Sequence, residues 1–200
     1  MSNQPRHRSE PTALHQHAED NLRFIRATME SSTSFTGVSG LGYVLAGLSA
    51  LPAAWLASRQ ADAAGWLVIW MLELVLASGL ALALTAWKAV KQGGSLMSPS
   101  GRKLFLAFLP AMAAGGLVTL SFFLSDHVAL LPGIWLSLYG AAVITAGAWS
   151  VRIIPVMGAL FMVFGALTLL TPVSGDLMLA LGMSGLHITF GILIWRHHGG

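Results

Sequence analysis

Six long apolar runs separated by short polar segments dominate the pattern of hydrophobic and polar positions along the chain. Each run has about the 17 to 25 residues that an α-helix needs to cross a hydrocarbon core of about 30 Å. The connecting segments are too short to hold a separate domain. The pattern therefore predicts an all-α, polytopic integral membrane protein whose six transmembrane helices form one antiparallel bundle. We place the runs at residues 36–57, 65–87, 104–124, 128–149, 153–170 and 177–195.

The first 35 residues are more polar, and we assign them to a tail that precedes the bundle at 36–196 and a short end at 197–200. Within this tail, apolar residues recur at helical spacing between charged ones, which predicts an amphipathic helix. The simpler interpretation is a helix that lies on the inner leaflet, and the alternative is a helix that docks on a partner. The recurring apolar residues are Leu14, Ala18, Leu22, Ile25 and Met29.

Basic residues fall almost entirely on one side of the predicted bundle. Ten of the eleven Lys and Arg residues precede the first run, lie in the second or fourth loop, or follow the last run, and only Arg59 lies on the other side. Loops rich in Lys and Arg stay in the cytoplasm. We therefore expect both termini in the cytoplasm and the protein in the cell inner membrane, with the loops that carry Asp62, Asp126 and Asp176 outside.

The composition excludes several classes of function. The chain is 55% hydrophobic and 10% charged, as membrane proteins are, and its net charge of +3 follows from basic loops rather than from nucleic-acid binding. The absence of Cys excludes disulfides, thiolate nucleophiles and Cys-bound metals. We find no motif for a nucleophile, a phosphate or a metal site. We therefore expect no enzymatic activity, catalytic residue, metal, cofactor or nucleic-acid partner.

Two ionisable side chains lie well inside the predicted spans. Glu73 carries the only formal charge in the middle of any span, and a carboxylate in hydrocarbon costs at least about 2.5 kcal/mol and usually marks function. His187 lies in the last run. At about 1.5 Å per residue, Glu73 is about 12 Å and His187 about 15 Å below the outer boundary. From this shared depth we predict a buried pair that shares one proton.

The alternative for His187 is a plain structural role. Ala180, Ser184, His187 and Gly191 lie on one stripe of small and polar residues, which in a membrane packs against protein rather than lipid. A neutral imidazole in such a place would bond to a hydroxyl or carbonyl group across a helix interface.

Aromatic residues accompany Glu73 on the same helix face. Trp66 and Trp70 precede it by two turns and one turn, and Tyr139 occupies the corresponding place in the fourth run. With Ser184, these side chains are candidates for the lining of an outward-facing cavity. The alternative is that the aromatic residues belong to the belt at the membrane surface.

Small residues at intervals of four in the first run favour close approach of another helix. They are Gly42, Ala46, Ala50 and Ala54, whose plain meaning is helix packing, and the same face is the candidate for contact with a second copy of the chain or a membrane protein partner. Together these patterns favour a small membrane-embedded binding, assembly or accessory subunit in the lipid bilayer. The alternative is a proton-linked carrier or channel for a small solute that uses Glu73 and His187.

Overall fold

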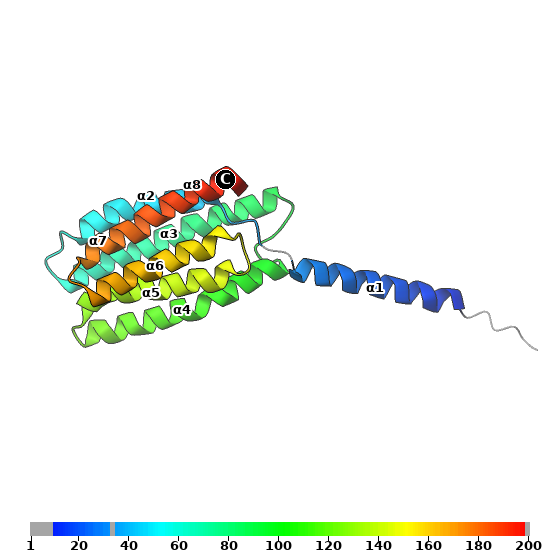
Figure 1. Cartoon of the computed structure of the whole chain (residues 1–200), viewed down its shortest axis with the longest axis horizontal. Helices are drawn as coiled ribbons and strands as arrows, with labels where there is room; N and C mark the ends of the chain where they lie inside the picture. The colour runs from blue at the N-terminus through cyan, green and yellow to red at the C-terminus, as the bar shows by residue number, and fades with distance from the viewer. Residues whose placement is uncertain (1–9, 33–34, 199–200) are drawn as a thin grey trace, which may run out of the picture. The chain divides into compact units, whose positions relative to one another are not determined.

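The computed structural model describes residues 10–32 and 35–198, and these residues form helices joined by short turns, with no strand among them (Figure 1). The chain divides into two compact units, residues 1–33 and 34–200. Six helices of the second unit are long and apolar enough to cross a membrane. The predicted all-α, multi-pass fold is therefore confirmed.

The first unit contains the helix α1 (Glu10–Ser32), which confirms the amphipathic helix predicted for the tail. Leu22, Ile25 and Met29 recur on one face of α1 and are all exposed within this unit. Contact of this apolar face of α1 with the inner leaflet, or with a partner as the alternative, stays a prediction.

The second unit is a bundle of six antiparallel spans. The first three are α2 (Gly40–Ala57), α3 (Ala63–Lys91) and α4 (Pro99–Leu124). A short 3-10 turn η1 (Val128–Leu130) leads into α5 (Leu131–Gly147), which is followed by α6 (Ile153–Leu170). The last span is composite, because a π-helical segment η2 (Ala180–Leu186) joins α7 (Gly175–Leu179) to α8 (His187–His198).

Helix caps move several boundaries away from the apolar runs. The first span begins at Gly40 rather than at 36, because the Ser39 hydroxyl accepts a hydrogen bond from the Gly42 amide at 3.1 Å. The third span begins at Pro99 rather than at 104, after a similar cap by Ser98. The second span reaches Lys91, beyond the predicted end at 87. Hydropathy marks the part of a helix that suits lipid, whereas caps decide where the helix itself begins and ends.

The two ends of the bundle differ in charge. We call the end that carries Asp62, Asp126 and Asp176 the acidic end. The opposite end, where α3, α5 and α8 finish, is the basic end, and its described Lys and Arg residues are Lys88, Lys91, Arg102, Lys103, Arg152 and Arg196.

Glycines bring the helices of the bundle into backbone contact. A Cβ atom on Gly140 of α5 would lie 2.6 Å from the carbonyl oxygen of Gly158 in α6, and one on Gly158 would lie 2.7 Å from that of Gly140. In the same way a Cβ atom on Gly191 of α8 would lie 2.7 Å from the Val44 amide nitrogen in α2. Because no side chain fits at these positions, α5 pairs with α6 and α2 pairs with α8.

The ladder of small residues in α2 serves packing inside the chain. Gly42, Ala46, Ala50 and Ala54 are all buried, and a Cβ atom on Gly42 would lie 3.3 Å from the Cα atom of Ala81 in α3. The face that we expected to offer to a second copy or a partner is therefore already covered within the chain.

The segment before α2 is tied to the basic end of the bundle. The Phe35 amide donates to the Trp149 carbonyl at 2.7 Å, and the Ser150 hydroxyl donates to the Phe35 carbonyl at 2.8 Å. Lys88 of α3 is buried and donates from Nζ to the Val38 carbonyl at 3.0 Å. These bonds satisfy backbone groups that no helix uses.

Candidate functional site

Glu73 points into the bundle from α3. Its side chain is only 7% exposed, whereas those of its neighbours Leu72 and Leu74 are 65% and 42% exposed. The Ser49 hydroxyl of α2 donates a hydrogen bond to Glu73 Oε1 at 2.8 Å. The small residues of α2 bring α3 close enough for this bond.

His187 also points inward, from the first residue of α8. Its Nε2 atom lies 2.6 Å from the Tyr139 hydroxyl oxygen of α5, and its Nδ1 atom lies 2.9 Å from the Met183 carbonyl oxygen. A carbonyl oxygen only accepts, so Nδ1 carries the hydrogen and Nε2 accepts from Tyr139. This is a neutral imidazole bonded to a hydroxyl across a helix interface, the plain alternative considered for His187.

Aromatic rings surround the imidazole. The rings of Tyr43, Phe161 and Tyr139 lie 5.6, 5.3 and 5.4 Å from the His187 ring, measured between centroids. The residue follows directly on the π-helical segment η2. Single π turns of this kind change which side chains a helix points inward, and they are frequent at functional sites.

The predicted direct pair of Glu73 and His187 is not what the structure shows. The carboxylate bonds to Ser49 and the imidazole bonds to Tyr139, and both residues are within the part of the chain that the structure describes. The helix α2 packs against both α3 and α8. Equal depth in the membrane does not decide which helices are neighbours. Here α2 lies between α3 and α8 and separates the Glu73 carboxylate from the His187 imidazole.

Trp66, one of the expected cavity-lining residues, makes aromatic and polar contacts at the acidic end. Trp66 stacks on Trp135 of α5 with the ring centroids 5.2 Å apart, and its indole Nε1 donates to the Asp176 carboxylate at 2.8 Å. Trp135 in turn donates to the Thr119 hydroxyl of α4 at 2.8 Å. These indoles therefore make specific contacts between helices at the acidic end.

Two of the predicted lining residues bury a polar atom that has no hydrogen-bond partner among the residues that the structure describes. They are Trp70, through its indole Nε1, and Ser184, through its hydroxyl. Their side chains are 5% and 2% exposed. A buried polar atom left unpaired costs about 1 to 3 kcal/mol, so each is a place where a ligand or water would stabilise the protein.

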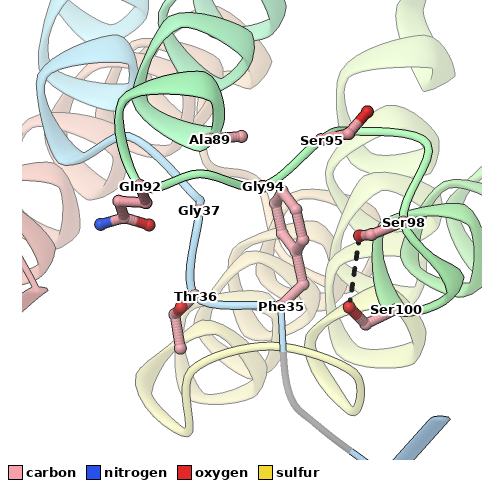
Figure 2. A pocket seen from close by; sticks show the side chains of 9 residues that line it. All are labelled: Phe35, Thr36, Gly37, Ala89, Gln92, Gly94, Ser95, Ser98 and Ser100. Carbon is pink, nitrogen blue, oxygen red and sulfur yellow. Dashed lines mark hydrogen bonds between the residues drawn. The ribbon is translucent and has the colours of Figure 1, made fainter. Parts of the chain in front are cut away.

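One polar pocket, of about 200 Å³, lies elsewhere, at the basic end (Figure 2). It lies between the segment before α2, the end of α3 and the start of α4. Figure 2 shows the Phe35 ring between Gly37 and the hydrogen-bonded pair Ser98 and Ser100, whose hydroxyl oxygens are 3.4 Å apart. The polar groups therefore do not converge on one point. The lining residues are Phe35, Thr36, Gly37, Ala89, Gln92, Gly94, Ser95, Ser98 and Ser100.

Sequence reasoning missed the partners of the buried polar groups. Ser49 was not considered as a partner of Glu73, nor Asp176 as a partner of Trp66. Ser49 could be found by depth, since it lies about 12 Å from the outer end of α2, close to the level of Glu73. The sequence pattern places Tyr139 with the aromatic residues but does not predict its bond to His187.

No three His, Asp or Glu side chains come together as a metal site in residues 10–32 and 35–198. We found no family model, curated protein or solved structure that matches this chain. The function is therefore argued from the geometry alone.

Proposed function

We propose that this protein is a membrane-embedded assembly or accessory subunit without enzymatic activity, which binds a transmembrane helix of another chain through α4. We also propose that it lies in the cell inner membrane with the basic end and both termini in the cytoplasm, because basic loops are retained there.

The observation that supports this proposal is an exposed heptad stripe on α4. Its spacing of three and four residues matches the seam of a left-handed helix pair. Two small residues, Ala113 and Gly116, lie at its centre, and a Cβ atom on Gly116 would meet no atom within 4 Å. A surface that faces lipid gains nothing from small residues, whereas small residues let a second helix approach closely. The exposed stripe consists of Leu106, Leu109, Ala113, Gly116, Leu120 and Phe123.

The rest of α4 agrees with a peripheral helix. Gly101 is the only buried residue of its 26 residues, and α4 packs along α5 through a narrow face. The wide outer face is free to contact either lipid or a second protein.

A substitution at Gly116 tests the proposal. Replacing Gly116 by Leu should dissociate the native complex, because the branched side chain holds the partner helix away from the α4 backbone. Gly79 of α3 is also exposed with open space around it and supplies the control Gly79→Leu. The size of the complex extracted in mild detergent is measured by analytical ultracentrifugation. A single-chain mass for the parent protein, or an unchanged complex in the Gly116 variant, would refute the proposal.

A second candidate function is a proton-linked carrier or channel for a small solute. It is favoured by one observation, the buried Glu73 carboxyl group in the middle of a span. A purely structural bundle would be more stable with an apolar residue at this position.

A further inference from the structure

Glu73 is a buried carboxyl group without a cation. The Ser49 hydroxyl is its hydrogen-bond partner among the described residues, and no Lys, Arg or His side chain of these residues forms an ion pair with it. A lone carboxylate is costly to hold away from water. It therefore either takes up a proton or binds a cation.

The geometry at Ser49 fits a proton on Glu73. Its hydroxyl oxygen lies 2.8 Å from Glu73 Oε1 and 2.9 Å from the Ala46 carbonyl oxygen. One hydroxyl hydrogen does not satisfy two acceptors at once. When Glu73 is protonated, it donates to Ser49, and Ser49 donates to Ala46, so that both bonds form together.

Aromatic rings extend from Glu73 towards the acidic end. Trp70 and Trp66 lie one and two turns away on the same face of α3, with ring centroids 6.3 Å apart. Trp66 is stacked on Trp135. Indole rings attract cations through their faces, and a carboxylate beside them supplies the countercharge. The indole Nε1 of the buried Trp70, in the same region, has no hydrogen-bond partner among the described residues.

We propose that Glu73, Trp70 and Trp66 form a binding site for a monovalent organic ammonium ion, which exchanges with one proton on Glu73. In the exchange the ammonium ion enters, the carboxyl O–H bond breaks, and the proton leaves to solvent, so that the site remains neutral. Trp66 moves off Trp135 to admit the ligand. The proposal rests on the second candidate function, because it names the ligand class of the same site.

The ligand class follows from the donors at hand. A metal ion such as Ca²⁺ or Mg²⁺ needs about six oxygen ligands. The site offers one carboxyl group and one hydroxyl group beside two indole rings. An organic ammonium ion needs a single countercharge, and its apolar groups suit the rings.

Other ionisable groups on the surrounding helices do not supply the exchanged proton. Tyr43 lies on α2 beside His187, and Tyr139 and His187 bond to each other. Asp176 is occupied by the Trp66 indole at the acidic end, and Lys88 donates to Val38 at the basic end.

Calorimetric titration of the purified full-length protein in detergent with tetraethylammonium chloride tests the site, and sodium chloride at equal ionic strength is the reference. We expect one ion bound and one proton released per chain. The number of protons released is obtained by comparing the heat of binding in buffers that differ in their enthalpy of ionisation. Affinity should rise by up to about tenfold per pH unit while Glu73 is protonated, because ligand and proton compete.

Three variants localise the binding. Glu73→Gln keeps the hydrogen bond to Ser49 but carries no charge, and it should bind at least about tenfold more weakly. Trp70→Phe should bind about threefold more weakly through the loss of the stronger indole face. Asp126→Asn removes an exposed carboxylate at the acidic end and should bind as the parent does.

Absence of tetraethylammonium binding by the parent protein, or equal binding by Glu73→Gln, overturns the proposed site. Proton flux in reconstituted vesicles is measured in parallel, and it separates the two hypotheses. Flux without ammonium binding retains the carrier and rejects this ligand, whereas binding without flux retains the site and rejects the carrier.

Discussion

At the scale of the residue, the buried ionisable side chains Glu73 and His187 are each hydrogen-bonded to a side chain from another helix. Ser49 bonds to Glu73, and Tyr139 bonds to His187. Such bonds matter in a region without water, because a buried polar atom that loses its partner cannot bond to solvent instead. The two pairs should therefore act as separate units.

Double-mutant cycles test this separation. Tyr139→Phe and His187→Gln each leave a buried polar atom unpaired and should lower the free energy of unfolding by about 1 to 3 kcal/mol. Together they should cost less than the sum, by at least about 0.5 kcal/mol, since they remove the same bond.

Glu73→Gln combined with His187→Gln supplies the control cycle. These residues bond to different partners, so their effects should add to within about 0.5 kcal/mol. The free energies are measured by chemical denaturation in detergent. Additivity of the Tyr139 and His187 variants, or coupling of the Glu73 and His187 variants, would contradict the bonding described above.

At the scale of the element, glycines spaced seven residues apart decide which helices pair. Gly133, Gly140 and Gly147 follow one side of α5, and Gly158 and Gly165 face them from α6. Seven residues are close to two helical turns, so these positions remain on one face over the whole span. Close contact of backbones along this face replaces the hydrophobic effect, which does not operate between helices in lipid.

A single added methyl group should disturb the α5 and α6 pair. Gly140→Ala places a Cβ atom 2.6 Å from the Gly158 carbonyl oxygen, so the two helices must move apart. We expect a loss of about 1 to 3 kcal/mol in the free energy of unfolding. Gly79→Ala, where the space is open, should change it by less than about 0.5 kcal/mol. Equal stability of the two variants would show that the pair is not tightly packed.

The helix α1 should be dispensable for folding of the bundle. It belongs to a compact unit of its own, and the spans satisfy their own backbone hydrogen bonds. Deletion of residues 1–30 should therefore leave insertion and thermal stability in detergent unchanged. A lower midpoint of thermal unfolding for the truncated protein would mean that α1 stabilises the bundle by direct contact.

At the scale of the whole molecule, the bundle is polarised along its length. The basic end gathers six Lys and Arg residues of the described chain, and two of them lie over aromatic rings. The Nζ atom of Lys91 lies 3.9 Å from the centroid of the Trp87 ring, and that of Lys103 lies 4.9 Å from the Trp149 ring. Such pairs suit the membrane interface, where the ring meets lipid and the charge meets water.

This polarity predicts the orientation in the membrane. Reporter fusions after residues 62, 126 and 176 should be active outside the cytoplasm, and fusions after 95 and 198 should be active inside it. Alkaline phosphatase and a fluorescent protein give opposite readings and control for expression. An inside reading after residue 126 would refute the six-span arrangement.

Features that vary along the chain or along the membrane normal can be predicted from the sequence alone. The number of spans and the inward direction of Glu73 and His187 follow from hydropathy and helical period, which are properties of each segment alone. Even the depth of the two residues could be estimated from their distance to the span ends. The burial of both side chains agrees with this reasoning.

Which side chains meet depends on how the helices pack against one another. Glu73 bonds to Ser49 and not to His187, because α2 packs between α3 and α8. That order depends on close backbone contacts such as those of Gly191 with α2 and of Gly140 with Gly158. A hydropathy pattern places a residue along the membrane normal, but its neighbours depend on the rotation and order of the helices around the bundle, which packing determines.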